Sequence, residues 1–569
     1  MANGMGSLYV GASGLQNSQN ALNTTANNMA NVDTKGYVRQ QVLFSDRTYN
    51  TFDKTSGAGI SFQQAGLGVN IADVVHSRDQ FLDKYYRTET GRLAFYEKSY
   101  EVINEVEDLF QELEGATYQD TLNDFWVAFQ ELSKEPDSSV KQNLVVQKAT
   151  LFMERAQSIY ASTISYQKNM NVQIIDQVER VNELGNLISD LNEQIRTIES
   201  ADLDTAMTLR DERDKALDEL GSLIRIDYKE TPEGAVKVRV EGVEFVDEVR
   251  CYEMGLHEDK VTDFMTPYWP HLSDEDKEQY YNVFDFTNGI SSYNDTDLGS
   301  LKALVLSRGD RIANYTDIEG VEASVYNKDV GQCIVMNAQA ELDQLIHKIV
   351  TSINDILCPN TRASFTGSDG KVYKNVKVWD EQNGCVGTDG VKPGHELFVR
   401  RGCERYKEVT SIDGKTYYVY NEENMDDTSQ QYTVQSLMLN EALVREETYI
   451  PHIKSNGEID YGMAAKLAAV WSEDLLTLNP NNTDVCSFVE YYERMIDSFA
   501  TEGSVYNTLT TTLEGSSMSI ENQRQQVIGV SSDEELTNMI KYQNAYNAAS
   551  RYINVISEML EHLIMQLGS

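Results

Sequence analysis

Apolar residues near the start of the chain recur in alternating steps of four and three. Because this spacing keeps the side chains on one narrow face of a helix, as in a coiled coil, it predicts a helix that needs a partner. Gln19 is a polar interruption in the pattern. We call the apolar positions the first seam: Leu8, Ala12, Leu15, Leu22, Ala26 and Met29.

The same spacing returns near the end of the chain and has no polar interruption there. We call these positions the second seam: Met539, Tyr542, Tyr546, Ala549, Ile553, Ile556, Leu560, Leu563 and Leu567. Isolated helices of this length are marginal in water, so each seam must be buried by packing. We therefore expect the two ends of the chain to pair as a terminal coiled coil.

The first helix is weakened by glycine and lacks charge on its other face. Each of its glycines costs about 1 kcal/mol relative to alanine. The face opposite the seam consists of the amides Gln16, Asn20, Asn23, Asn27 and Asn31. Amides bond to neighbours without the desolvation cost of a charge, which favours contact on both faces. The alternative is a single amphipathic helix that packs on its own domain.

The middle of the chain alternates between helical and strand periodicity. Helical spacing extends over about residues 81–224, with interruptions at Gly115 and Pro136. Period-two alternation indicates a β-rich insertion from about residue 226. Helical spacing returns over residues 342–356, a second β-rich stretch contains the hairpin signal Asp413-Gly414, and residues 482–528 are helical again.

These periods predict an α+β multidomain chain with nested insertions. The 569 residues, 41% of them apolar, are enough for several buried cores. We assign residues 1–44 with 529–569 to a terminal coiled-coil domain, residues 45–225 with 298–357 and 482–528 to a long-helix bundle domain, and residues 226–297 and 358–481 to inserted β-rich outer domains.

The formal charge of −42 is concentrated in the middle of the chain. The first 50 residues carry +1 and the last 40 carry −3, which leaves −40 between them. Because phosphate binding depends on Lys and Arg, this charge argues against nucleic acid and anionic membranes as partners. We also expect no cleaved secretory signal and no membrane-spanning helix.

The reactive side chains form no recognisable catalytic or metal-binding pattern. The six cysteines contain no C-x-x-C pair, and the seven histidines contain no H-E-x-x-H motif. Asp211 and Asp214 share a helix face with Arg210 and Arg213 beside them, which favours a solvent-exposed salt-bridge network over acid–base catalysis. We therefore expect no catalytic residue, no cofactor and no metal.

Residues 26–40 resemble the N-terminal signature of the axial proteins of the bacterial flagellum. The version over Gly36–Gln40 is most similar to the hook-associated protein 1 family, although Asp33-Thr34-Lys35 stands where that family usually has Asn-Thr-Pro. The motif residues are Asn27, Asn28, Asn31, Gly36, Tyr37, Arg39 and Gln40.

The resemblance continues over residues 1–225, 298–357 and 482–569, whereas the β-rich insertions resemble no family. Its main blocks lie at residues 66–87, 123–136, 209–220, 298–310, 529–535 and 542–560. A hook or rod protein would lack the long helical region, and flagellin would lack the asparagine motif.

The resemblance implies a structural junction protein, not an enzyme, that connects the flagellar hook to the filament outside the cell. It implies export as an unfolded chain through the flagellar type III apparatus with an export chaperone. The implied partners are copies of the chain in a helical array, the hook protein and the second hook–filament junction protein. One alternative is a surface adhesion or binding module on the tyrosine-rich insertions, and a third hypothesis is an enzyme carried there.

Overall fold

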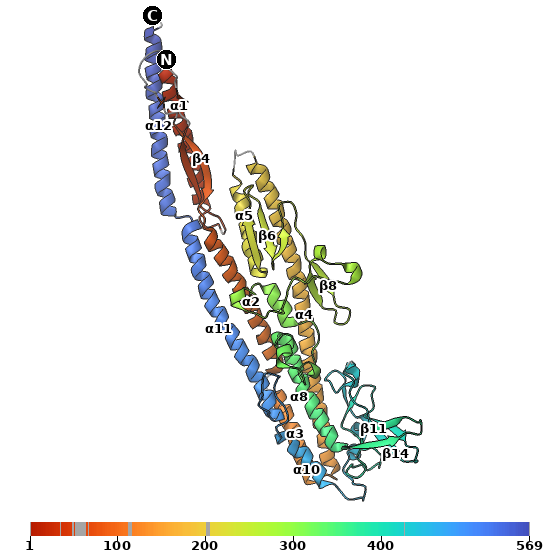
Figure 1. Ribbon diagram of the computed structural model, residues 1–569. Helices are drawn as coiled ribbons and strands as arrows, with labels where there is room; N and C mark the ends of the chain where they lie inside the picture. Colours follow the sequence, from red (N-terminus) through yellow and green to blue (C-terminus); the bar gives the residue numbers. More distant parts are fainter. Residues whose placement is uncertain are drawn as a thin grey trace. The chain divides into compact units, whose positions relative to one another are not determined.

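The computed structural model describes residues 2–34, 36–47, 50–51, 64–65, 68–111, 117–200, 205–425 and 427–567 (Figure 1). Helices dominate and the strands form small sheets, so the predicted α+β multidomain class is confirmed. The chain divides into two compact units, of which unit 1 comprises residues 1–93, 180–253 and 512–569, and unit 2 comprises residues 94–179 and 254–511. The three-domain division made from the sequence stays a prediction.

Three long helices contribute residues to both units: α2 (Gln80–Gln111), α4 (Ser139–Glu199) and α11 (Phe488–Ile528). The predicted interruption at Pro136 is confirmed, because α3 ends at Lys134 and α4 begins at Ser139. The other predicted interruption, at Gly115, lies outside the described residues. The sequence pattern missed the end of α4 at Glu199, before α5 begins at Met207.

In unit 1 the first and last helices lie side by side (Figure 1). These are α1 (Ala2–Ala30) and α12 (Ser532–Leu567). They run antiparallel, since Gly11 faces Ile553 and Gly14 faces Ala549. An antiparallel ribbon of β1 (Gln40–Asp46) and β4 (Val69–His76) contacts α1, and a short pair, β2 (Asn50–Thr51) with β3 (Gln64–Ala65), extends the hairpin.

The rest of unit 1 combines α5 (Met207–Leu223) with an antiparallel three-stranded sheet. Its strands are β5 (Ile226–Glu230), β6 (Val236–Val240) and β7 (Val243–Val246). The β-rich insertion predicted from about residue 226 thus begins as expected. Asn192 of α4 holds the sheet, because its side chain donates to the Val236 carbonyl (2.8 Å) and accepts from the Val236 N–H (2.9 Å).

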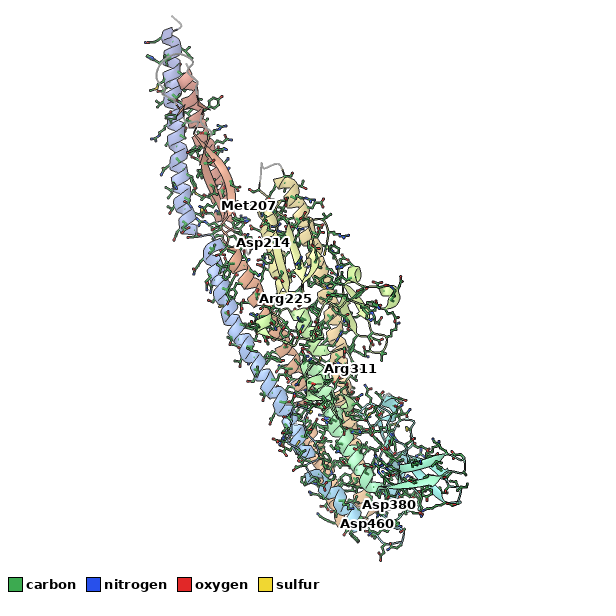
Figure 2. The ribbon with its side chains drawn as sticks, viewed as in Figure 1. Met207, Asp214, Arg225, Arg311, Asp380 and Asp460 are labelled. Atoms are coloured by element: carbon green, nitrogen blue, oxygen red, sulfur yellow. The ribbon has the colours of Figure 1, made fainter. Side chains whose placement is uncertain are left out.

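Unit 2 has an aromatic core around α3 (Tyr118–Lys134), which starts with a capping box at Thr117. The rings of Phe125 and Phe152 pack on each other. Phe125 also packs on Trp471, and Phe152 packs on Phe398, both from later segments of the chain. Helix α8 (Ile334–Leu357) is almost entirely buried, and α10 (Tyr461–Ala469) packs on α3. Asp460, labelled in Figure 2, caps α10 by accepting from the N–H groups of the next turn.

Two β modules emerge from unit 2. The first is the hairpin β8 (Gly255–Glu258) and β9 (Met265–Tyr268). The second is a four-stranded antiparallel sheet in the order β10 (Asn360–Thr366), β11 (Val372–Trp379), β14 (Thr416–Tyr420) and β13 (Tyr406–Thr410). The hairpin predicted at Asp413-Gly414 is confirmed by the pairing of β13 with β14.

Shorter elements complete unit 2. The strands are β12 (Phe398–Arg400) and β15 (Leu437–Leu439), and the helices are α6 (Ser300–Arg308), α7 (Ala323–Tyr326) and α9 (Glu441–Arg445). Single 3-10 turns lie at Pro270–Leu272, Glu275–Lys277, Ser292–Asn294, Tyr315–Asp317, Val330–Gln332, Thr428–Gln430, Glu447–Tyr449 and Val470–Ser472.

Candidate functional site

The helix pair of unit 1 is closest where α1 has no side chain. A Cβ on Gly11 would lie 2.7 Å from Cγ1 of Ile553 and 3.0 Å from the Tyr552 ring. A Cβ on Gly14 would lie 3.6 Å from the Cβ of Ala549, an ordinary contact. The glycines that weaken α1 as an isolated helix therefore allow α12 to approach its backbone.

The predicted seam residues are distributed along these two helices, and the seam alanines Ala12 and Ala26 are exposed. Half-buried members are Leu8, Leu15, Leu22 and Met29 of α1, and Tyr546, Ile553, Ile556 and Leu560 of α12. Leu563 is 54% exposed, and the side chain of Leu567 is outside the described residues. The structure thus brings the two seam-bearing helices together, while the role of each seam residue in assembly stays a prediction.

Helix α12 carries further apolar side chains that α1 leaves uncovered. Val555 and Met559 lie four residues apart, on one face of the helix, and are 48% and 59% exposed. Ile564 and Met565, near the end of the helix, are 71% and 67% exposed. Exposed apolar surface of this kind is typical of a contact site for another protein. We call Val555 and Met559 the outer face of α12.

The motif after α1 folds around Asn28, which is only 1% exposed. Its Nδ2 donates to the Gln40 carbonyl (2.9 Å), and its Oδ1 accepts from the Gln40 N–H (3.1 Å) and the Tyr37 hydroxyl (2.8 Å). One side chain thereby satisfies both backbone groups of a residue twelve positions later. Gly36, at φ +86°, allows the reversal of the chain between them.

The other two motif asparagines close the end of α1. Asn31 Nδ2 donates to the carbonyl of Asn27 (3.0 Å), and Thr34 donates its hydroxyl to Asn31 Oδ1 (3.2 Å). Asn27 in turn contacts the Tyr37 hydroxyl at 3.4 Å. These bonds satisfy groups that a helix end leaves without partners inside the helix.

Arg39 connects the motif to the start of α12, almost 500 residues further along the chain. Its guanidinium lies 2.8 Å from the buried carboxylate of Glu535 and 2.9 Å from Glu534. The backbone N–H of Arg39 donates to the Ile528 carbonyl at 2.9 Å. Both carboxylates lie in the first turn of α12, where negative charge is also stabilised by the helix dipole.

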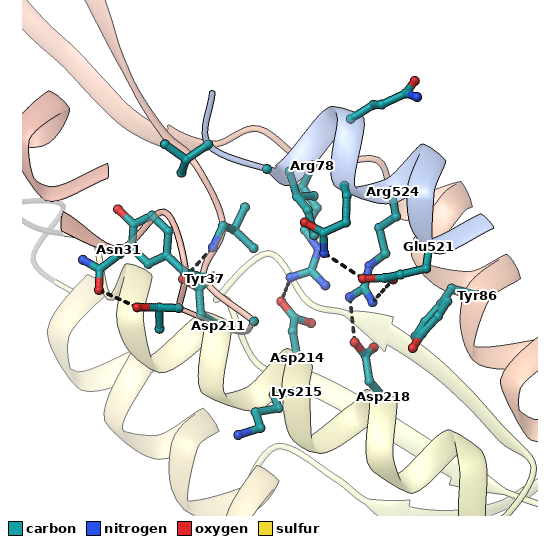
Figure 3. A pocket seen from close by; sticks show the side chains of 18 of the residues that line it. Asn31, Tyr37, Arg78, Tyr86, Asp211, Asp214, Lys215, Asp218, Glu521 and Arg524 are labelled. Carbon is teal, nitrogen blue, oxygen red and sulfur yellow. Dashed lines mark hydrogen bonds and ion pairs between the residues drawn. The ribbon is translucent and has the colours of Figure 1, made fainter. Parts of the chain in front are cut away.

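A cavity of about 730 Å³ lies beside this connection, lined by the motif loop, α5 and the end of α11 (Figure 3). Three arginines and three aspartates line or adjoin it. We call them the Arg–Asp cluster: Arg78, Arg87, Arg524, Asp83, Asp214 and Asp218.

The Arg–Asp cluster joins α2, α5 and α11 through short ion pairs. Arg524 lies 2.7 Å from Asp83 and 2.7 Å from Asp218, and Arg87 lies 2.6 Å from Asp218. Arg78 contacts Asp83 and Asp214. Burial alone would raise the pKa of Asp83, but the bond from Arg78 and the charges of all three arginines lower it below its ordinary value.

The sequence-based expectation of a solvent-exposed network at Asp211 and Asp214 is wrong. Arg213 is only 2% exposed and binds the Gly234 carbonyl (2.6 Å), while Asp214 pairs with Arg78 and Arg87 instead of its sequence neighbours. Side chains from α2 and the strand before it cover this face of α5, which the sequence of α5 alone does not reveal.

Asp211 faces the motif loop across the cavity rim. Its Oδ2 accepts from the Val38 N–H (3.3 Å), and its Oδ1 lies 3.3 Å from Nε2 of His76. Burial raises the pKa of Asp211 to about 7, and burial together with the charges of Arg78 and Arg210 lowers the pKa of His76 to about 4. His76 is therefore neutral at pH 7. Such a pair fits a buried structural contact.

No group of three or more His, Cys, Asp or Glu side chains in the described part of the chain is arranged to hold a metal ion. None of the helices described has an apolar stretch long enough to cross a membrane.

Family models match three parts of the chain. The model of the flagellar hook-associated protein FlgK helical domain matches residues 103–362. That of the flagella basal body rod protein matches residues 8–37, and that of the flagellar basal body rod FlgEFG protein C-terminal region matches residues 522–567. The last two matches cover most of α1 with the motif as far as Tyr37, and the end of α11 with α12.

Similar proteins extend over nearly the whole chain. Flagellar hook-associated protein 1 of Bacillus subtilis is 25% identical over 97% of this chain and 96% of its own length. The Escherichia coli protein of the same name is 21% identical over 97% and 98%. The solved structure of the flagellar hook junction protein FlgK from Burkholderia pseudomallei has a similar fold, with a TM-score of 0.50 and 11% identity over 78% of this chain and 100% of that one. Because the likeness runs from the motif through the helical middle to α12, the chain is similar to flagellar hook-associated protein 1 along nearly its whole length.

Proposed function

We propose that the chain is a structural junction protein that connects the flagellar hook to the filament. Copies of it form a helical array through α1 and α12, with the hook protein on one side and the second junction protein on the other. Its place in the flagellum is outside the cell, and it performs no catalysis. The names of the relatives support the junction role, and the shared rod and hook regions support assembly with axial proteins.

The observation that carries this proposal is the uncovered outer face of α12. Helix α1 covers the side that includes Ile553, yet Val555 and Met559 next to it remain about half exposed. A helix with apolar residues on two sides needs two sets of partners, one from its own chain and one from outside it. Neighbouring copies in an array supply the second set without closing into a dimer.

The weak terminal helices also suit export. Among the described side chains of α12, Glu535 alone is buried, so this helix gains little stability within one copy. A chain with ends of this kind passes unfolded through the type III apparatus after an export chaperone has bound it. Its ends then become ordered between neighbouring copies at the growing tip. The acidic middle keeps copies apart before that point.

Replacing Met559 by Asp tests the role of the outer face. Met559 is 59% exposed, so the substitution leaves the folding of the single chain unchanged, but it places a charge where a neighbour must bury an apolar side chain. We expect the variant to be exported and to be absent from isolated flagella by immunoblot, with motility lost. Leu560→Asp, on the half-buried side, should have the same effect.

Asn554→Asp is the matched control, because Asn554 is an exposed polar residue of the same helix. It should be incorporated like the wild type. Normal incorporation of Met559→Asp together with normal motility would contradict the proposed use of this face.

A further inference from the structure

The two β modules of unit 2 carry opposite charge, although the whole chain is strongly acidic. We define the basic sheet as residues 360–379 and 406–420, and the acidic module as residues 254–285. The basic sheet has six Lys or Arg against three Asp or Glu, whereas the acidic module has two against eight. All six cations of the sheet are exposed: Arg362, Lys371, Lys374, Lys377, Lys407 and Lys415.

The far end of the basic sheet forms a compact tip from two adjacent turns. The Ser368 N–H donates to the Thr410 carbonyl (2.8 Å), and the Ile412 N–H donates to the Thr366 carbonyl (2.9 Å). These bonds hold the β10–β11 and β13–β14 turns side by side. The tip exposes apolar surface, since Ile412 is 72% exposed and the nearby Val372 is 58% exposed.

A stack of aromatic rings positions the side chains of two lysines at this tip. Phe365 lies between Tyr373 and Tyr417, with ring centroids 5.0 and 4.1 Å apart and nearly parallel planes. The ammonium of Lys371 lies 5.4 Å over the ring of Tyr373, and that of Lys415 lies 5.0 Å over the ring of Tyr417. Cation–π contacts of this kind restrict the lysines, so little entropy is lost when they meet a carboxylate.

Lys415 also lies 3.9 Å from Glu381, a distance at the limit of an ion pair. Both side chains are more than half exposed, at 59% and 53%. Exposed pairs of this type are worth at most about 1 kcal/mol, so Lys415 stays available to another partner.

The acidic module presents the complementary surface. Its exposed carboxylates are Glu258, Asp259, Asp263, Glu275, Asp276, Glu278 and Asp285. Among them Val261 is 90% exposed and Tyr281 is 53% exposed. The Val261 loop is held in place by Asp259, whose Oδ1 accepts from the N–H groups of Val261 (2.8 Å) and Thr262 (3.0 Å).

Within one copy the two surfaces are attached at opposite ends of α8. The acidic module is anchored by Arg308, which binds the Met265 carbonyl at 2.8 Å, and the adjacent Gly309 packs on Met336 near the start of α8. The basic sheet begins at Asn360, directly after α8 ends at Leu357. At 1.5 Å per residue, these attachment points are roughly 30 Å apart along the helix.

We propose that the tip of the basic sheet in one copy docks on the acidic module of a neighbouring copy. The inference rests on the proposed function, because the array places copies next to one another. An apolar centre with a charged rim of opposite sign is the usual anatomy of a protein interface. Two different surfaces of one chain that bind each other repeat from copy to copy, as a helical array requires.

Cross-linking within isolated flagella tests this contact. A carbodiimide joins a lysine to a carboxylate only where the two touch, and a product between copies migrates as a dimer on a denaturing gel. We expect a dimer whose peptides link Lys371 or Lys415 to Glu275, Asp276 or Glu278.

Charge reversal makes the test specific. The double variant Lys371→Glu/Lys415→Glu should still be incorporated, because its α1 and α12 are unchanged, but should give about tenfold less dimer, since like charges then face each other. Combining it with Glu275→Lys/Asp276→Lys in the same chain should restore the dimer. The control Lys328→Glu/Lys466→Glu makes the same change in charge at two exposed lysines elsewhere in unit 2 and should leave the dimer unchanged.

Each other outcome overturns the inference. If the wild-type chain is present in flagella but no dimer forms between these surfaces, or if the tip lysines are linked to hook protein or filament protein, the contact between copies is wrong. Binding of the tip to an acidic polysaccharide in place of a copy would also overturn it. If the chain is absent from flagella altogether, the proposed function fails first and the inference fails with it.

Discussion

At the scale of single residues, the most unusual group in unit 2 is the carboxyl of Glu341. It is fully buried in α8, and its Oε1 accepts weak bonds from Asn337 (3.2 Å) and Asn479 (3.3 Å). Its Oε2 has no hydrogen-bond partner among the described residues. Burial, with a smaller effect of the nearby Glu502 carboxyl, raises the pKa of Glu341 to about 8.

The raised pKa predicts that unit 2 loses stability as pH rises. In the folded chain Glu341 keeps its proton up to about pH 8, whereas in the unfolded chain it loses the proton near its ordinary value of 4.5. Its stabilising effect is therefore full below about pH 4.5 and lost by about pH 8, a change on the order of 3–5 kcal/mol.

Glu341→Gln should flatten this dependence, because an amide has no proton to lose. We expect the variant to be at least as stable as the wild type at pH 8 in chemical denaturation measured from pH 5 to 9. The exposed Glu322→Gln serves as control and should follow the wild-type curve. Parallel curves for wild type and Glu341→Gln would show that the buried carboxyl is not the cause.

Sequence reasoning identified the motif residues but not their contacts. The resemblance to the axial-protein signature singles out Asn28 and Gly36, yet nothing in the pattern indicates that Asn28 pairs with the backbone of Gln40. Glu341 precedes Leu342 in a helix whose apolar spacing was recognised, and only the packing of other segments on both sides of α8 reveals that the glutamate is buried. Contacts that depend on distant segments leave no local signal.

At the scale of elements, the pairing of α1 with α12 depends on glycine at the point of closest approach. Both helices were predicted from the three-four spacing of apolar residues. Helix propensity alone makes the glycines a cost, yet Gly11 and Gly14 lie three residues apart, on the side of α1 that meets α12. Small residues at helical spacing beside an apolar seam are the signal that could have located the contact.

Gly11→Leu should separate the two helices. Its side chain would collide with Ile553 and Tyr552, whereas Gly6→Leu introduces the same side chain where no atom lies within 4 Å of the new Cβ. We expect hydrogen exchange in α1 to be faster in Gly11→Leu by at least about tenfold, equivalent to about 1.4 kcal/mol. In Gly6→Leu it should stay unchanged or slow, since leucine favours helix more than glycine does. Equal exchange in both variants would mean that the contact at Gly11 is not required.

The sequence predicts where strands of the β modules lie, but not the order in which they pair. The alternation at Val236, Val238 and Val240 and the turn at Asp413-Gly414 located strands correctly. The order of the four strands in the basic sheet depends on which hairpin packs beside which. That choice is made by side chains such as Phe365 and Tyr417, whose stacking joins two hairpins about fifty residues apart.

At the scale of the whole molecule, stability is uneven. Core residues of unit 2 such as Phe125, Phe152 and Leu345 are inaccessible to solvent, whereas α12 has almost no buried side chain among those described. Segments with few buried contacts open locally at low cost and are cut first by proteases.

We therefore expect limited proteolysis of the purified monomer to remove roughly the first and last 30 to 40 residues before any other cut in a helix. Mass spectrometry of the fragments would locate the sites. The same protease applied to isolated flagella should leave both ends intact, because neighbouring copies cover them. Ends that resist cleavage in the monomer would contradict ordering on assembly.

The antiparallel register of α1 and α12 has a consequence for quality control. Residues made first, around Gly11, pack against residues made last, around Ile553. A polypeptide cut short by a premature stop lacks the helix that covers this side of its beginning. The proposed assembly, which uses both helices, would therefore leave out such a product and accept complete molecules.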